Sequence, residues 1–334
     1  MSEIRQNLVT KDWVIIATER AKRPEDFKKK NSVSPQLPKF EKNCPFCPGN
    51  EKDMSPEETL RVDKNGKWQV RIIPNKYPAL SRTEERIRTV DGIKRKITGA
   101  GIHEVVIETP LHNTTTALLP KEDVESIIKS YKIRYNEMLK DERVEMIIIF
   151  KNHGEAAGTS LVHSHSQIVA TPVVPAQVRE RFHDAQQYFD ENLECVFCKI
   201  LAEELKDGKR IVLETDGFVS FIPYAALSPF HMWIYPKRHT SSFGEISNNE
   251  MEDLAEHLRI VLLKYYRGLD NPDFNYVIRS APTGLKNIEF FHWYLSIVPR
   301  ITKTAGFELG SGMFINTSLP ENDAEFLRNV KMDL

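Results

Sequence analysis

The chain has 334 residues, 40% hydrophobic and 28% charged, an ordinary globular balance with enough material for two domains or one duplicated domain. Lys and Arg number 46 against 47 Asp and Glu, so the formal net charge of −1 provides no global field to attract nucleic acid or an anionic membrane. No apolar run approaches the roughly 18 residues that span a bilayer, and the N-terminus lacks the apolar core of a signal peptide. We therefore expect a cytoplasmic protein that binds neither nucleic acid nor membrane.

The first half of the chain offers a defined order of predicted elements. Alternating or continuous apolar runs predict strands at 13–18, 68–73, 104–108, 146–150 and 166–171. A turn-rich segment that contains two cysteines lies between the first two strands. A helix is predicted over 121–139, where Pro120 introduces apolar residues at helical spacing.

The second half repeats this order. A second cysteine-containing knuckle precedes strands predicted at 211–214, 219–223, 232–235, 275–279 and 293–298, and a helix over 248–269 comes before the last two strands. The repeat indicates a duplicated α+β unit. We divide the chain into an N-terminal half, residues 1–176, and a C-terminal half, residues 177–334.

Each half carries one Cys-x-x-Cys pair, and these pairs account for all four cysteines. The pairs are Cys44 with Cys47 and Cys195 with Cys198. A cytoplasmic chain seldom keeps structural disulfides, and a thioredoxin-like redox pair would lie between a strand and a helix, which the surroundings of Cys44 do not suggest. Thiolates at this spacing can bind one zinc ion together with two further ligands. A metal site is therefore favoured over a redox pair or coincidence.

Histidines fall in the same order in the two halves. His112 is followed 51 residues later by His163, and His239 is followed 53 residues later by His292. A lone histidine is more often a core or surface residue, but two Cys₂His₂ sets in one order are hard to obtain by chance. We predict zinc ligands at Cys44, Cys47, His112 and His163, and a second metal position at Cys195, Cys198, His239 and His292. The histidines outside this order are interpreted as structural, with His153 kept in view for its nearness to the site: His103, His153, His183, His231 and His257.

The stretch from Asn152 to Gln167 carries the residues that could do chemistry. In an extended segment, residues i and i+2 point the same way, so His163, His165 and Gln167 would line one face. With His163 committed to zinc, His165 stays free as a neutral imidazole, which is a competent nucleophile at phosphorus. Gln167 and Ser160 could hydrogen-bond the non-bridging phosphate oxygens, where charge builds up in the transition state.

His165 has no counterpart in the second half. The residue that corresponds to His163 is His292, which places Tyr294 at the position of His165. The second copy therefore keeps a possible metal ligand and lacks the nucleophile. One catalytic centre per chain follows.

Six segments, none of them specific alone, are together characteristic of one family. They are residues 20–24, 44–47, 74–78, 101–108, 152–167 and 306–308. In these segments the chain resembles the galactose-1-phosphate uridylyltransferase family of the histidine-triad superfamily, over essentially its whole length. The resemblance implies an α+β fold of two histidine-triad-like halves, each with an antiparallel sheet and flanking helices. It also implies a homodimer with sites near the subunit interface.

The resemblance further implies a ping-pong reaction. A nucleotide sugar gives its nucleoside monophosphate to His165 and releases a hexose 1-phosphate, and a second phosphate-bearing acceptor then takes the nucleotidyl group. Carried over by position, the substrate-binding residues are Arg20, Arg23 and Asn75 for the nucleotide, Asn152 with Ser160 and Gln167 for the transferred phosphate, and Phe307 and Glu308 for the hexose.

The chain departs from the family pattern in two places. The usual triad reads His-Pro-His-Gly-Gln, whereas Ser164 and Ser166 occupy its second and fourth positions here. Many uridylyltransferases also place a late His-x-His pair at a second iron or zinc site, where this chain has Ser296 and Val298. Its second set is Cys₂His₂ instead, for which zinc is expected and iron is an alternative. Both departures resemble the ADP-glucose phosphorylase branch, in which AMP is carried and inorganic phosphate is the acceptor.

Three functions stay open at this point. The preferred one, as the commoner activity, is a UDP-glucose–hexose-1-phosphate uridylyltransferase that acts on galactose 1-phosphate in galactose metabolism. The second is an ADP-glucose phosphorylase or adenylyltransferase that uses the same histidine. The third is a zinc-stabilised binding protein without turnover. His165 and Gln167 argue against the third, because a structural zinc site needs neither.

Overall fold

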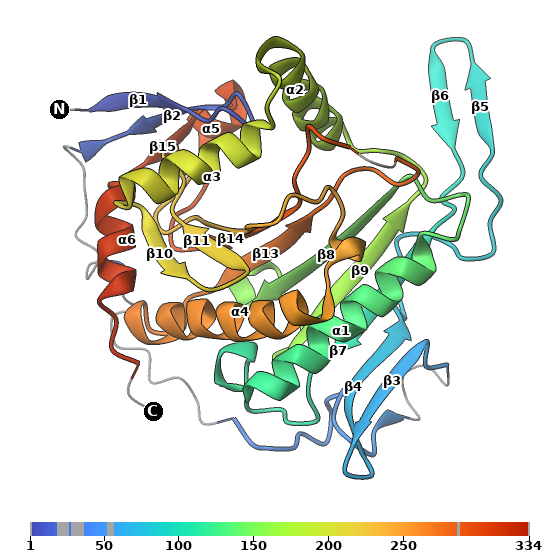
Figure 1. The fold of residues 1–334 in the computed structure, drawn as a ribbon. Helices are drawn as coiled ribbons and strands as arrows, with labels where there is room; N and C mark the ends of the chain where they lie inside the picture. The colour runs from blue at the N-terminus through green and yellow to red at the C-terminus, as the bar shows by residue number, and fades with distance from the viewer. Residues whose placement is uncertain (1, 19–26, 28–36, 52–56, 286–287, 333–334) are drawn as a thin grey trace.

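Both halves of the chain contribute strands to one antiparallel sheet (Figure 1). The computed structural model describes residues 2–18, 27, 37–51, 57–285 and 288–332. The first half supplies β3 (Leu60–Lys64), β4 (Lys67–Pro74), β7 (Ile102–Ile107), β8 (Met146–His153) and β9 (His165–Thr171). The second half supplies β10 (Ile211–Glu214), β11 (Phe218–Phe221), β12 (Met232–Pro236), β13 (Phe274–Arg279) and β14 (Tyr294–Pro299). Across this ten-stranded sheet the order is β10-β11-β12-β14-β13-β8-β9-β7-β4-β3.

The strand order is a palindrome about the pairing of β8 with β13. Outward from this seam, β8, β9, β7, β4 and β3 match β13, β14, β12, β11 and β10. At the seam, His153 pairs with Phe274 and Ile149 with Ile278, in antiparallel register. The predicted duplication of an α+β unit is thus confirmed. The two copies do not keep separate sheets, because joining them edge to edge satisfies the backbone N–H and C=O groups that each inner edge would otherwise leave unpaired.

Two long helices cover one face of the sheet. They are α1 (Lys121–Met138) and α4 (Asn248–Gly268), which lie side by side (Figure 1). Helix α1 begins directly after Pro120, and Ser247 and Glu250 form a capping box at the start of α4. Apolar side chains of both helices pack on the sheet in one continuous core that draws residues from both halves.

The opposite face of the sheet carries the two cysteine pairs. Cys44 and Cys47 pack in an apolar cluster with Trp68 and residues of β4 and β7. In the second half, α3 (Val196–Asp207) begins directly after Cys195 and packs on β11, β12 and β14. This segment was expected to form a turn-rich knuckle like the first one. It is helical because helix-forming residues with apolar side chains at helical spacing follow the cysteines.

Smaller elements complete the fold. A three-stranded sheet of β1 (Glu3–Gln6), β2 (Trp13–Ile16) and β15 (Phe314–Asn316) accompanies α5 (Gly306–Ser311) and α6 (Pro320–Arg328). A hairpin of β5 (Arg88–Asp91) and β6 (Lys94–Ile97) projects from the body (Figure 1), and α2 (Ala176–Asn192) follows β9. Short 3₁₀ helices are η4 (Thr116–Leu118), η5 (Glu155–Ala157) and η6 (Phe243–Glu245). Within the described ranges, no helix is both long and apolar enough to cross a membrane.

Every strand and helix expected from the apolar pattern is present, with ends shifted by three residues at most. The elements that sequence reasoning did not anticipate are β1, β3, β5, β6, β15, α2, α3, α5 and α6. The strands among these have three to five residues, too few for a clear periodic signal, and β1, β5 and β6 are largely exposed as well.

Candidate active site and metal centres

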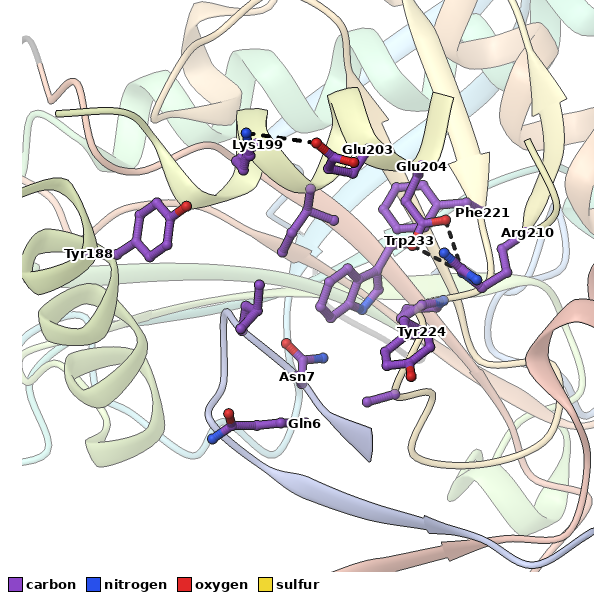
Figure 2. A pocket seen from close by; sticks show the side chains of 14 residues that line it. Gln6, Asn7, Tyr188, Lys199, Glu203, Glu204, Arg210, Phe221, Tyr224 and Trp233 are labelled. Carbon is purple, nitrogen blue, oxygen red and sulfur yellow. Dashed lines mark hydrogen bonds and ion pairs between the residues drawn. The ribbon is translucent and has the colours of Figure 1, made fainter. Parts of the chain in front are cut away.

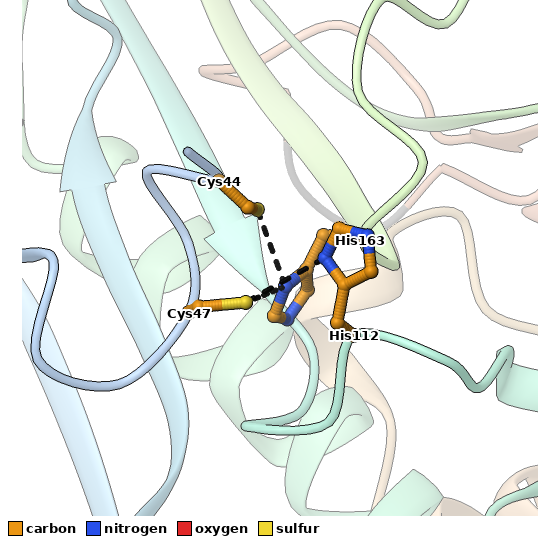
Figure 3. A group of neighbouring side chains, drawn as sticks. All are labelled: Cys44, Cys47, His112 and His163. Atoms are coloured by element: carbon orange, nitrogen blue, oxygen red, sulfur yellow. Dashed lines mark hydrogen bonds between the residues drawn. The ribbon is translucent and has the colours of Figure 1, made fainter. Parts of the chain in front are cut away.

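The first cysteine pair converges with two histidines on one point of the sheet (Figure 3). Cys44 and Cys47 come from the loop before β3, His112 from the loop after β7, and His163 from the segment that leads into β9. Their ligand atoms all lie within 4.8 Å of one another, and all four side chains are buried. Sγ of Cys47 lies 3.5 Å from Nδ1 of His112, and both sulfur atoms lie 3.6 Å from Nδ1 of His163.

These distances suit one zinc ion. Tetrahedral coordination with Zn–S near 2.3 Å and Zn–N near 2.0 Å places sulfur and nitrogen ligands about 3.5 Å apart. Burial raises the pKa of the Cys44 thiol to about 11, so two neighbouring thiolates at this place need a cation. Nε2 of His163 lies 2.8 Å from the carbonyl oxygen of Thr109, which orients the ring with Nδ1 toward the sulfur atoms. The group predicted from the sequence is therefore able to hold a metal ion.

The second group is more open. The ligand atoms of Cys195, Cys198 and His239 lie within 4.8 Å of one another, and Cys198 and His239 are partly exposed. Nδ1 of His239 lies 3.2 Å and Nδ1 of His292 lies 3.5 Å from Sγ of Cys198. All four predicted residues thus meet around Cys198. Their soft sulfur and imidazole donors are those that zinc takes in structural sites.

His165 begins β9, two residues after the metal-group residue His163. Its Nδ1 lies 2.8 Å from the carbonyl oxygen of His163. A carbonyl only accepts, so Nδ1 carries the proton and Nε2 keeps its lone pair. His165 is 8% exposed, and burial lowers the pKa of its imidazole, which favours the neutral form at neutral pH. The geometry is that of an oriented, uncharged imidazole able to act as a nucleophile.

Two adjoining cavities meet at His165, and they share Ser160 and Leu161 as well. The knuckle cavity, about 390 Å³, is lined by largely apolar residues that include Pro45, Phe46, Ile73, Tyr77 and Val105. The loop cavity, about 470 Å³, is lined by polar residues that include Asn152, His153, Thr159, Asn271 and Asp273. A ligand with a planar ring at one end and polar groups at the other can lie through both, with its middle at His165.

Gln167 belongs to a hydrogen-bonded chain along the wall of the knuckle cavity. Nε2 of His103 lies 2.7 Å from Oε1 of Gln167. Nδ1 of His103 accepts the backbone N–H of Ala79, so Nε2 carries the proton and donates to Gln167. This leaves the amide NH₂ of Gln167 as a donor beside His165.

His103 was interpreted from the sequence as structural, and its contacts place it instead among the candidate site residues. The order of histidines in the repeat could not reveal it, because that order only selects metal ligands. The signal available was strand alternation. His103 shares a face of β7 with Val105, and Val105 pairs directly with Gln167 on β9.

The loop between β8 and β9 is held by the second half of the chain. Oδ1 of Asn152 accepts a hydrogen bond from Nδ2 of Asn275 at 2.8 Å, and the backbone N–H of Ala156 donates to Oδ2 of Asp273 at 2.7 Å. Gly154 has a φ of +84°, and a Cβ there would lie 2.2 Å from the Asp273 carboxyl carbon. Only glycine fits both the backbone conformation and the close approach. The loop cavity is therefore formed by both halves.

Phe307 and Glu308, which the resemblance assigns to the hexose, are not brought to His165. Phe307 and Glu308 lie on α5, which packs beside β15, and neither lines the knuckle cavity or the loop cavity. The Glu308 carboxylate accepts the backbone N–H of Ala305 at 3.0 Å, at the start of its own helix. Arg20 and Arg23 lie outside the described residues.

The second half has a cavity of about 280 Å³ in the place that matches the knuckle cavity (Figure 2). Its wall includes Phe221 and Trp233, which pair across β11 and β12 as Ile73 and Val105 pair across β4 and β7. Tyr294 begins β14 as His165 begins β9, and it is buried. Among the described residues that line this cavity there is no histidine. The matching place of the second half thus offers no nucleophile of this kind.

An imidazole held neutral between a largely apolar cavity and a polar one suits an enzyme that carries nucleotidyl groups on histidine. Comparison with known families points to the same class. The sequence model of the galactose-1-phosphate uridyl transferase N-terminal domain matches residues 1–175, and that of the C-terminal domain matches residues 180–331. The chain belongs to the galactose-1-phosphate uridyl transferase family, as the resemblance in its sequence predicted.

Individual relatives are similar over the whole chain. ADP-glucose phosphorylase of Arabidopsis thaliana is 39% identical over 99% of this chain and 93% of its own length. Galactose-1-phosphate uridylyltransferase of Thermotoga maritima is 30% identical over 100% of both chains. The crystal structure of an ADP-glucose phosphorylase from Arabidopsis thaliana with bound ADP-glucose matches this fold with a TM-score of 0.84, at 34% identity and 100% coverage of both chains.

Proposed function

We propose that this protein is a nucleotidyltransferase that transfers AMP from ADP-glucose to inorganic phosphate, the activity of an ADP-glucose phosphorylase. The observation that carries the transfer chemistry is the free Nε2 of His165 at the junction of the two cavities. The sequence pattern led us to prefer UDP-glucose and galactose 1-phosphate as substrates. The relatives favour the alternative, because the phosphorylase is 39% identical and the uridylyltransferase 30%.

The proposed reaction has two balanced steps. In the first, the Nε2 lone pair of His165 attacks the α-phosphorus of ADP-glucose, and the bond from that phosphorus to the bridging oxygen breaks. Glucose 1-phosphate leaves with the bonding electron pair, and AMP stays on the histidine. In the second step, an oxygen of inorganic phosphate attacks the same phosphorus, ADP leaves and His165 regains its lone pair. The carbonyl of His163 stabilises the positive charge on the adenylylated ring through Nδ1–H.

The other site residues bind and orient the substrate. The amide NH₂ of Gln167 and the hydroxyl of Ser160 are donors for the non-bridging phosphate oxygens beside His165. Asn75 lines the knuckle cavity with Phe46 and Tyr77, where we place the adenosine. We place the departing glucose 1-phosphate in the loop cavity.

Zinc held by the first group would support the site structurally. The candidate ligands are Cys44, Cys47, His112 and His163, and four protein ligands close the tetrahedral shell of a structural zinc ion. With such an ion bound, Cys44 and Cys47 would be tied to His163, whose carbonyl orients His165. The chemical steps are assigned to the side chains of this chain alone.

The nucleotide is tested by covalent labelling. The protein is incubated separately with ADP-glucose and UDP-glucose, and its intact mass is measured under non-acidic conditions because phosphohistidine is acid-labile. We expect a mass increase of one AMP from ADP-glucose, and its loss on addition of inorganic phosphate with formation of ADP. A UMP adduct alone, discharged by galactose 1-phosphate, would instead support the uridylyltransferase. No adduct from either donor would support a zinc-stabilised binding protein.

We further propose that a second copy of the chain completes the sugar part of the site. The resemblance assigns Phe307 and Glu308 to the hexose. Their helix, α5, packs beside β15 of the small sheet, and neither residue lines the cavities at His165. We infer that both residues serve the site of another subunit instead. The chain would then act as a homodimer with two equivalent sites.

Mixing two inactive variants tests this arrangement. The variants His165→Ala and Glu308→Ala are prepared separately, mixed under conditions that exchange subunits, and assayed. If Glu308 acts on the partner's His165, a mixed dimer contains one intact site and one doubly altered site. The mixture should recover about a quarter of the wild-type activity, since half the dimers are mixed. If the exchanged mixture stays at the level of the separate variants, Glu308 serves its own chain or no site.

A further inference from the structure

A buried polar cluster lies behind His165, on the face of the sheet that α1 covers. It consists of Glu108, Tyr131, Lys151, Ser164, Ser166 and Tyr276, each at most 5% exposed. These residues come from five separate segments of the chain, including α1 and the seam strands β8 and β13. The buried hydroxyl of Thr116 also donates to Oε2 of Glu108 at 2.9 Å, and apolar core residues pack around the cluster. Burying this many polar groups is costly unless each has a partner, so the cluster calls for an explanation.

Each N–H bond of the Lys151 ammonium group has an acceptor, two in the cluster and one on the backbone of His165. Its Nζ lies 2.5 Å from Oε2 of Glu108, 2.9 Å from Oγ of Ser164 and 3.2 Å from the carbonyl oxygen of His165. An ammonium group has three N–H bonds, and these three acceptors match them. The Lys151 side chain therefore has one geometry, and that geometry includes the backbone of His165.

Glu108 balances the charge of Lys151 and binds the same segment. Oε2 of Glu108 also accepts the hydroxyl of Ser164 at 2.8 Å, and its backbone N–H donates to the carbonyl oxygen of Ser164 at 3.2 Å. Burial raises the pKa of the Glu108 carboxyl, but the nearby Lys151 ammonium and the hydroxyl donors outweigh it and bring the pKa to about 2. Burial lowers the pKa of the Lys151 ammonium group, and the neighbouring Glu108 carboxylate opposes this shift. The three acceptors around Nζ and the 2.5 Å contact with Glu108 fit an ammonium ion paired with a carboxylate, both buried.

Ser166 is held from the other side of His165. The hydroxyl of Tyr131 lies 2.6 Å from Oγ of Ser166 and 2.6 Å from the hydroxyl of Tyr276, and it also lies 3.2 Å from Oε1 of Glu108. The two serines that depart from the family's triad are therefore both members of this cluster. Proline and glycine at these positions would have no side-chain hydroxyl to offer.

Strand alternation explains how the cluster reaches the nucleophile. Ser164 and Ser166 point to the helix-covered face, so His165 between them points to the cavities. Lys151 hydrogen-bonds the hydroxyl of Ser164 and the carbonyl of His165, and Tyr131 hydrogen-bonds the hydroxyl of Ser166. The imidazole of His165 is in turn oriented by the carbonyl of His163, two residues earlier. The direction of Nε2 thus depends on the backbone that the cluster holds.

We propose that Glu108 and Lys151 are positioning residues for His165, and that Ser164 and Ser166 are the links through which they act. The proposal rests on the proposed function, in which His165 is the nucleophile. A buried ion pair is weak evidence for stability, because its desolvation offsets its attraction, so a role in fixing geometry explains its presence better. Nucleophilic attack at phosphorus tolerates little displacement, and a misplacement of about 1 Å can lower a rate by about 10²-fold.

The test separates positioning from stability by measuring the rate of the first chemical step. The variants are Ser164→Ala, which removes one link and no charge, and the double variant Glu108→Gln/Lys151→Met, which leaves neither charge unpaired. The control is Ser130→Ala, the same change at a buried serine of α1 whose hydroxyl bonds only to its own helix. Formation of adenylyl-His165 from saturating ADP-glucose is followed in a single turnover by intact mass, beside zinc content, Tm and KM.

We expect the single-turnover rate to fall about 10-fold in Ser164→Ala and about 10²-fold in the double variant, with KM and zinc content unchanged. The rate of Ser130→Ala should stay within about twofold of the wild type. Single-turnover rates near that of the wild type in both test variants would overturn the proposal. A fall in zinc content in proportion to the fall in rate would also overturn it, because the variants would then act through the metal group. If the double variant does not fold, Ser164→Ala decides alone. Absence of an adduct in the wild-type protein would instead refute the proposed function, and the positioning role with it.

Discussion

Replacing His165 with alanine is expected to abolish both the nucleotidyl adduct and turnover, with a loss of about 10⁴-fold or more in kcat/KM. The expectation follows from the single imidazole nitrogen that faces the junction of the two cavities with a free lone pair. No other described side chain that lines both cavities is a comparable nucleophile, since the shared residues besides His165 are Ser160 and Leu161. Adduct mass and steady-state assays with ADP-glucose and phosphate measure the effect.

The control for this change is a histidine away from the site. His183 is exposed on α2, and His183→Ala should label and turn over like the wild type. Zinc content and Tm should be preserved in His165→Ala, because the ring does not belong to the metal group. An adduct that survives in His165→Ala would show that another residue carries the nucleotide. His153, which also lines the loop cavity, would then be the first alternative to examine.

Removing one of the four residues of the first group is expected to abolish metal binding there and to destabilise the protein. Cys47 is fully buried, and Cys47→Ala removes the sulfur atom that approaches both His112 and His163. Binding energy of a structural zinc ion contributes directly to folding, so we expect zinc to be lost and Tm to fall by about 10 °C or more. Activity should disappear as well, because the carbonyl of His163 orients His165. Metal analysis and thermal denaturation measure the first two effects.

The matched variant is Cys198→Ala in the second group. Cys198 is partly exposed, and three rather than four ligand atoms of its group lie within mutual reach. We therefore expect a smaller fall in Tm and the retention of zinc in the first group. If the Cys47→Ala variant still binds zinc at the first group and its Tm is unchanged, the assignment of the first group as a structural metal site is wrong.

Periodicity predicted much of this fold because its main strands are buried on both faces or alternate cleanly. Enough apolar residues occur in β8, β9, α1 and α4 for the sequence pattern to predict these elements. The joining of the two sheets through β8 and β13 was not predictable, because a strand's sequence does not identify its neighbour. The segment at Cys198 was misjudged for a different reason, since the helix that encloses it depends on residues that follow the motif.

The candidate site was predicted where chemistry and spacing act together. The ligands of the first metal group were identified from two independent repeats of the same order, and they do meet in space. His103 and the buried pair of Glu108 with Lys151 were missed, because their roles arise from contacts between strands far apart in the sequence. The sequence pattern left the choice between adenosine and uridine open, although Ser164 and Ser166 resemble the phosphorylase branch. Whole-chain similarity to the Arabidopsis thaliana phosphorylase, and no single residue, moved the proposal toward adenosine.

The palindromic strand order is that expected if the chain arose from two copies of one smaller protein. The two units meet through corresponding strands, β8 in the first and β13 in the second. A symmetric pair of separate subunits has the same arrangement. Gene duplication followed by fusion would leave this arrangement in one polypeptide. Fusion frees the two copies to evolve apart, since a change in one is no longer imposed on the other. Such divergence explains a histidine at position 165 and a tyrosine at the matching position 294. In the present chain, Asp273 and Asn275 of the second copy hold β8 and the loop that follows it in the first copy.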